Sequence, residues 1–184
     1  MLVVEEREQL PVRQARAGDP EAWDFLFRRY QLPLYVYVFE LVRDEQDSLD
    51  IVQDTFIAAT HHIESLREDS KFGGWLFGIA HQKCVQSWRK QGREFDGREV
   101  EPSGPPDVQE APDDWLIRRE QEEEFMKLVN TLPPPQRSVL LLHYVEDFSL
   151  GQIGEITGVP VGTVKSRLHY AKTSLRKLLE ENRP

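Results

Sequence analysis

A stretch near the middle of the chain, residues 91–115, constrains the fold most, because it lacks the pattern of a folded element. It contains Pro102, Gly104, Pro105, Pro106 and Pro112, and its few apolar residues recur at no helical or strand spacing. Such a composition is typical of a linker that cannot bury enough apolar surface to fold. The sequence therefore predicts two domains, at 10–93 and 116–182, joined by a flexible acidic linker at 94–115.

The cysteine count and the apolar runs exclude several classes of protein. Cys84 is the single cysteine among the 184 residues, so we expect neither an intrachain disulfide nor a cysteine-rich zinc module. The first ten residues turn acidic after Met-Leu-Val-Val, which is unlike a signal peptide. No apolar run approaches the roughly 20 residues that span a bilayer. We therefore expect a soluble, cytoplasmic protein with no direct membrane insertion.

The net charge of −9 hides two basic segments. Residues 94–124 hold twelve acidic and three basic side chains. Their net charge of −9 equals the net charge of the whole chain. Residues 67–93 and residues 160–184 each hold six basic side chains against two acidic ones. The acidic average therefore does not exclude binding to nucleic acid, because the distribution of charge decides where a polyanion binds.

Helical spacing predicts an all-α fold for the N-terminal domain. Asp19 followed by Pro20 marks a helix start, and Asp47 or Ser48 is expected to cap a second helix. The buried face predicted for that second helix consists of Leu49, Val52, Phe56 and Ile63. Its outward face consists of Asp50, Gln53, Asp54, Ile57 and His61. A third helix follows a break at residues 72–74 and ends near residue 91.

The C-terminal domain is also predicted to be all-α. One helix is expected from about residue 113 to residue 132, and prolines 133–135 open the next. Ser149 caps a short helix that ends at Thr157–Gly158, and a long helix begins at Thr163. In the long helix one buried stripe recurs at steps of four and three: Val164, Leu168, Ala171, Leu175 and Leu178.

A short helix, a turn containing glycine and a longer helix form the helix-turn-helix pattern, whose second helix enters the major groove of DNA. The second helix here carries side chains suited to phosphates and base edges. All of them are expected to be exposed: Thr163, Lys165, Ser166, Arg167, His169, Tyr170 and Lys172. The alternative to DNA binding is an ordinary helical hairpin with a basic, solvated face.

Four segments together resemble one family, the sigma-70 factors of the extracytoplasmic-function (ECF) group. GVPVGTVKSRLHYAKTSLRKLL resembles the promoter-binding helix-turn-helix of that family, and PPPQRSVLLLHYVEDFSLGQIGEITG resembles the two helices before it. AWDFLFRRYQLPLYVYVFELVRDEQDSLDIVQDTFIAA resembles the polymerase-binding helices of the sigma-2 domain, and FGGWLFGIAHQKCVQSWRKQ resembles the helix that recognises the −10 element. The matches follow the family's order and cover nearly the whole chain outside the linker.

The resemblance implies an RNA polymerase sigma factor that binds core RNA polymerase and reads the −35 and −10 elements of promoter DNA. The implied polymerase-binding residues are Asp50, Gln53, Asp54 and Ile57, with a solvated acidic face as the alternative. The implied −10 residues are Arg67, Ser70, Lys71, Trp75, Gln82, Lys83, Trp88 and Arg89, around a loop that encloses a flipped base. A core position is the better interpretation of Trp75, whereas for Trp88 the two interpretations are about even.

The chain departs from the family pattern at several promoter-facing positions. His81 and Gln82 stand where an Arg-Asn pattern is frequent, Gln86 stands where an Asp is usual, and Tyr170 stands where Arg is common. These departures leave the fold assignment intact and the promoter sequence open.

The resemblance also implies an anti-sigma partner, which in this family is often membrane-bound. No metal is expected, because His81 and Cys84 supply only two ligands on one helical face. No cofactor, small-molecule substrate or catalytic role is expected either, because the sequence contains no phosphate-binding glycine loop, nucleophile elbow or paired-acid motif. Two other functions stay open: a two-domain helix-turn-helix regulator that never binds core polymerase, and a module that only binds other proteins. The alternative to an anti-sigma partner is self-restraint, in which the acidic linker covers the basic helix at 163–177.

Overall fold

A computed structural model describes residues 10–90 and 122–181, and all regular secondary structure in those ranges is helical. The all-α prediction is confirmed. The N-terminal half contains α1 (Val12–Arg16), α2 (Pro20–Val42), α3 (Glu45–His62), the short 3-10 turns η1 (Ile63–Ser65) and η2 (Asp69–Lys71), and α4 (Phe72–Lys90). The C-terminal half contains α5 (Glu122–Val129), α6 (Pro134–Tyr144), α7 (Leu150–Thr157) and α8 (Val161–Glu181).

The predicted helix caps are mostly confirmed because they are local. The Asp19 carboxylate accepts a hydrogen bond from the Glu21 amide, with Pro20 in the first turn of α2. Ser149 and Gln152 form a reciprocal capping box that starts α7. Gly158 ends α7 in the left-handed conformation, with φ at 71°.

Three boundaries differ from the prediction, and the first is the start of α4, which lies at Phe72 although the sequence predicts a break at residues 72–74. α3 is capped by Asp44, whose carboxylate accepts from the Asp47 amide, so the predicted caps Asp47 and Ser48 are wrong. This register buries Ser48 and leaves Leu49 48% exposed, against the prediction that Leu49 is buried. α8 begins at Val161, two residues before the expected start. The first part of the helix predicted from residue 113, like the linker at 94–115, lies outside the described residues.

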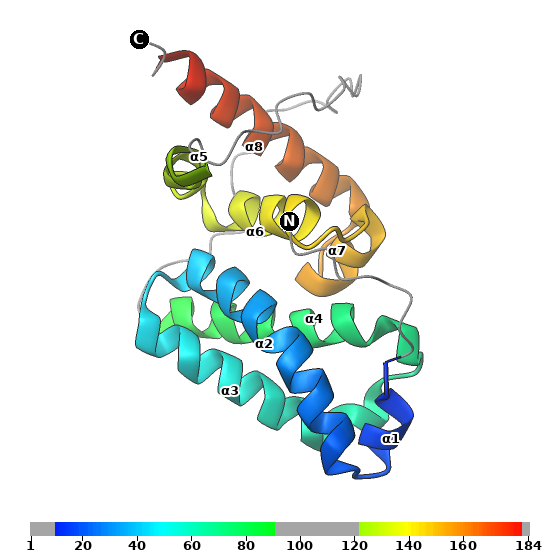
Figure 1. The fold of residues 1–184 in the computed structure, drawn as a ribbon. Coiled ribbons are helices and arrows are strands. Elements are labelled where there is room, and N and C mark those ends of the chain that lie inside the picture. The colour runs from blue at the N-terminus through cyan, green and yellow to red at the C-terminus, as the bar shows by residue number, and fades with distance from the viewer. Residues whose placement is uncertain (1–9, 91–121, 182–184) are drawn as a thin grey trace.

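The two halves pack directly on each other, with α6 and α7 lying over α2 and α4 (Figure 1). The ring of Phe148 meets the ring of Phe77 edge-on, with centroids 5.2 Å apart. The buried guanidinium of Arg137 donates across the interface to the backbone oxygen of Glu40 at 3.0 Å. The predicted domain boundaries remain a prediction. Within residues 10–90 and 122–181, no helix combines the length and apolar character needed to cross a membrane.

Candidate nucleic-acid interface

The helix-turn-helix is formed by α7, the turn at Gly158 and α8. Val164, Leu168, Ala171 and Leu175 are buried as one stripe, whereas Leu178 is only partly buried. The stripe packs α8 against α6 and α7, which holds the first turns of α8 at a fixed orientation. The scaffold that a major-groove recognition helix requires is therefore present.

The predicted DNA-contacting residues of α8 differ in exposure. Lys165 and His169 are exposed, whereas Thr163, Ser166, Arg167, Tyr170 and Lys172 are half-buried. The prediction that the whole set is exposed is therefore wrong for this arrangement of the halves. Lys172 lies over the Tyr144 ring, with its Nζ 5.2 Å from the centroid. Arg167 lies near enough to His81 of α4 for its charge to help lower the pKa of that imidazole.

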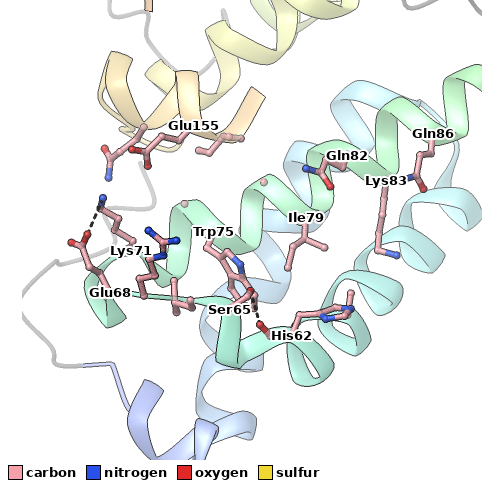
Figure 2. A pocket seen from close by; sticks show the side chains of 17 residues that line it. His62, Ser65, Glu68, Lys71, Trp75, Ile79, Gln82, Lys83, Gln86 and Glu155 are labelled. Carbon is pink, nitrogen blue, oxygen red and sulfur yellow. Dashed lines mark hydrogen bonds and ion pairs between the residues drawn. The ribbon is translucent and has the colours of Figure 1, made fainter. Parts of the chain in front are cut away.

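A pocket of about 690 Å³ lies between α3, the segment 63–71, α4 and α7 (Figure 2). We call residues 63–71, which include η1 and η2, the pocket loop. Trp75 and Ile79 supply apolar surface, and Arg67, Lys71 and Lys83 supply positive charge. An aromatic ring beside several cations is the combination that stacks a base and contacts its phosphates.

Two cations of the pocket, Lys71 and Lys83, are paired with carboxylates in this arrangement. Lys71 forms an ion pair with Glu68 at 3.2 Å, and this hydrogen bond, together with the nearby charge of Glu155, raises the pKa of Lys71. Lys83 reaches Asp54 of α3 at 3.6 Å. Glu155 belongs to α7, so the C-terminal half places a negative charge where a phosphate would approach.

The two tryptophans of α4 differ in burial in the opposite sense to the one expected. Trp88 is 2% exposed and lies in the core, so the prediction that it contacts DNA is corrected: no face of its ring is open to a base. Trp75 is half-buried and lines the pocket, where its ring can meet a ligand. Spacing alone did not separate them, because both recur at helical intervals on α4.

The remaining predicted −10 residues lie at the surface around the pocket. Arg67, Lys71 and Gln82 are exposed and line it, while Ser70 and Arg89 are exposed outside its lining. Sequence reasoning missed several further lining residues: His62, Ser65, Leu66, Ile79, Gln152, Glu155 and Ile156. The last three come from α7, and no sequence pattern indicated that this helix would cover α4.

The predicted polymerase face of α3 is exposed. Asp50, Gln53, Asp54 and Ile57 all face solvent, with Ile57 48% exposed, and Leu49 joins them two turns earlier on the same helix. Asp50 accepts a hydrogen bond from Gln46 at 3.0 Å. Single exposed apolar side chains are common on solvated surfaces, so the assignment of this face to polymerase stays a prediction.

Three titratable groups lie around the buried Tyr37, of which His81 and Cys84 are buried and Glu146 is half-buried. His81 is hydrogen-bonded to the Tyr37 hydroxyl at 2.8 Å, and burial, with Arg167, lowers its pKa to about 4. Burial raises the pKa of Cys84 to about 12, so the thiol is inert. Burial and Asp147 raise the pKa of Glu146 to about 7. Over residues 10–90 and 122–181, no three His, Cys, Asp or Glu side chains converge as metal ligands.

The fold and these surfaces define a two-part helical protein of the DNA-binding transcription class. Two family models match it: "Sigma-70 region 2" over residues 26–94 and "Sigma-70, region 4" over residues 122–175. The chain is 29% identical over 178 residues to the ECF RNA polymerase sigma factor SigW of Bacillus subtilis, covering 92% of this chain and 95% of that protein.

Two solved structures share the architecture. One is the sigma factor RpoE with the anti-sigma factor NepR from Bartonella quintana, at a TM-score of 0.66 and 26% identity, covering 89% of this chain and 99% of that one. The other is CnrH with the cytosolic domain of CnrY, at a TM-score of 0.69 and 23% identity over 95% and 98%. The chain belongs to the sigma-70 family and is an ECF sigma factor.

Proposed function

We propose that this protein binds core RNA polymerase and directs promoter-specific initiation, with α8 at the −35 element and the pocket of α4 at the −10 element. The observation that carries the proposal is that one chain combines a helix-turn-helix, a pocket that joins an aromatic ring with cations, and an exposed α3 face. Lys165 and Arg167 lie in the first turns of α8, where a helix in the major groove meets bases. Trp75 and Lys71 suit a splayed single-stranded base rather than a duplex.

The compact arrangement bears on how promoter binding proceeds. Elements centred about 25 base pairs apart lie roughly 85 Å apart on B-DNA. Contact between α7 and α4, with Arg167 near His81, is incompatible with such a separation. A chain of 31 residues, the number between the described halves, can span at most about 110 Å, which is enough to bridge the two elements. We therefore propose that the halves separate when the promoter is bound.

Partners and location follow from the same proposal. The protein would act in the cytoplasm, where its polymerase and promoter are, and it would carry out no covalent chemistry itself. Likeness to a sigma factor solved with an anti-sigma factor supports the proposal that such a partner also restrains this chain. The predicted restraint by the acidic linker remains a prediction, because the linker lies outside the described residues.

Binding to core polymerase separates this proposal from a regulator that never contacts the enzyme. Full-length protein is incubated with purified core polymerase, and the bound fraction is titrated. We expect Ile57→Asp to weaken binding at least about tenfold, equivalent to roughly 1.4 kcal/mol, because Ile57 is the exposed apolar centre of the α3 face. Leu179→Asp, a similarly exposed aliphatic position on α8, is the matched control and should bind normally. Absence of binding by the wild-type chain would support the regulator instead.

A further inference from the structure

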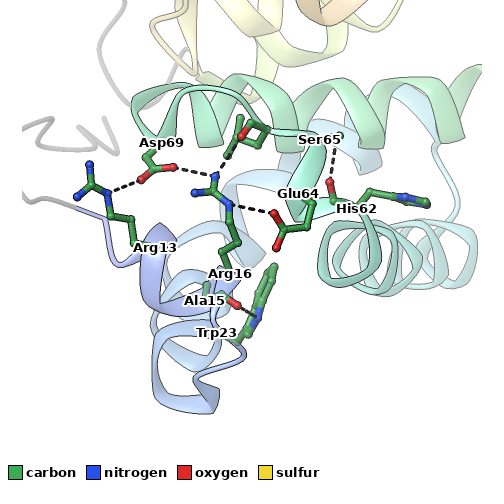
Figure 3. Close-up of polar contacts among 9 residues, drawn as sticks. Arg13, Ala15, Arg16, Trp23, His62, Glu64, Ser65 and Asp69 are labelled. Atoms are coloured by element: carbon green, nitrogen blue, oxygen red, sulfur yellow. Dashed lines mark hydrogen bonds and ion pairs between the residues drawn. The ribbon is translucent and has the colours of Figure 1, made fainter.

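Arg16 of α1 binds the pocket loop on the side that faces away from the pocket (Figure 3). The Arg16 Nη2 donates to the backbone oxygen of Leu66 at 3.0 Å and to the Asp69 carboxylate at 2.9 Å. Its Nε lies 3.9 Å from the Glu64 carboxylate. A single guanidinium thus contacts the loop at three places within six residues. Because its side chain is only 26% exposed, these bonds are less screened than those of a surface pair.

The segment that Arg16 holds is a wall of the pocket. Ser65, Leu66, Arg67 and Glu68 all line the cavity, and they lie between the contacts at Glu64 and Asp69. Among these four, only Leu66 is buried, and Ile63 at the start of the loop is buried as well. Residues 67–69 contain no buried side chain, so the shape of that stretch depends mainly on the polar bonds of Arg16.

α1 is itself fixed, which makes it a suitable support. Val12 and Ala15 are buried, and the Trp23 indole N–H donates to the backbone oxygen of Ala15 at 2.9 Å (Figure 3). Gly18, at φ 86°, makes the sharp connection from α1 to α2. The region 2 model matches from residue 26, so α1 lies outside the segment that this model describes.

We propose that Arg16 is a positioning residue that holds the pocket loop in the shape that receives a base, and that it thereby sets base preference at the −10 element. This inference rests on the proposed function of the pocket. Arg16 itself faces the back of the loop and does not line the cavity. Its effect should therefore fall on discrimination between bases, while phosphate contacts from Lys71 and Lys83 remain.

Arg13 provides a matched control on the same helix. Its Nε lies 3.3 Å from the same Asp69 carboxylate, but its side chain is 89% exposed and it makes no contact with the Leu66 backbone. Exposed pairs of this kind contribute little. Arg13→Gln therefore removes one positive charge from α1 without releasing the loop.

The experiment uses full-length protein assembled with core polymerase. A labelled single-stranded pool randomised over the −10 positions identifies the strand that the wild-type complex selects. Affinity is then measured for the four strands that differ at its most selective position. Thermal melts and core affinity are recorded for each variant.

We expect Arg16→Gln to reduce discrimination between the best and worst base at least about fivefold, with affinity for the worst strand nearly unchanged. Arg13→Gln should discriminate like wild type, and Arg16→Lys, which can reach only one acceptor at a time, should be intermediate. Wild-type discrimination by Arg16→Gln, or an equal loss for all four bases, would overturn the inference. If Arg16→Gln melts below the assay temperature, Arg16→Lys decides by the same criteria. A wild-type complex that selects no strand would instead refute the proposed function of the pocket, and the inference with it.

Discussion

Truncation of Phe148 tests whether contact between the halves restrains DNA binding. The Phe148 ring lies edge-on to Phe77 and contacts α4 beside Gly74. Phe148→Ala leaves the loop backbone bonded, since the Phe148 amide donates to Leu142 and its carbonyl accepts from His143. The loss should therefore fall on the interface rather than on either half.

The magnitude follows from the burial of one half-buried aromatic ring. About 100 Å² of apolar surface removed from water contributes roughly 2.5 kcal/mol, and an edge-to-face pair adds about 0.5–1.5 kcal/mol. Allowing for relaxation at an open interface, Phe148→Ala should destabilise the closed arrangement by about 2–4 kcal/mol. This shifts the equilibrium toward separated halves by roughly 30- to 1000-fold.

Two measurements on the full-length protein check this expectation. Small-angle scattering should show a larger radius of gyration for Phe148→Ala. Its affinity for a selected −35 duplex should also rise, and the size of that rise depends on how much of the wild-type protein has its halves in contact. Phe25→Ala is the control, because Phe25 is 39% exposed on α2. Unchanged scattering together with unchanged duplex affinity would show that contact through Phe148 does not restrain DNA binding.

Three other outcomes follow from the described residues. Leu168→Ala should cost about 2–5 kcal/mol in a denaturant titration, because Leu168 is buried in the α8 stripe; a loss below about 1 kcal/mol would contradict that packing. In duplex binding measured across a salt series, Arg167→Ala should cost about 1–3 kcal/mol of binding free energy and relax the preference at one base pair. Lys172→Ala should weaken binding to all sequences alike and reduce the slope of log affinity against log salt concentration by about one. Wild-type binding by both variants would exclude these roles. Because burial raises the pKa of Glu146 to about 7, its share of stability is complete below the unfolded pKa of about 4.5 and is lost as pH rises through 7. Thermal melts should therefore find Glu146→Gln more stable than wild type by about 1–2 kcal/mol at pH 8 and equal to it near pH 4, and a constant difference across pH would contradict the assignment.

Features set by neighbouring residues were predictable from the sequence. The Asp19 cap, the Ser149 capping box and the buried stripe of α8 each depend on spacing within one helix. The α3 cap was misassigned because Asp44, Asp47 and Ser48 are all competent caps, and the choice between them is made by packing.

Features set by distant contacts were not predictable. The ranking of Trp75 and Trp88 depends on which face of α4 meets α2 and α3, and helical periodicity alone does not specify that face. Arg16 and Asp69 are 53 residues apart, and an isolated arginine in a short helix gives no periodic signal. The position of α7 beside the pocket depends on how the N-terminal and C-terminal halves pack together, and the helical pattern within each half does not specify that packing.

Transcription from genomic DNA by purified core polymerase, with and without the full-length protein, is the direct test of promoter-specific initiation. We expect new start sites in the presence of the protein, preceded by shared −35 and −10 sequences, and loss of those starts with Ile57→Asp but not with Leu179→Asp. A set of start sites identical to that of core polymerase alone would contradict the proposed function.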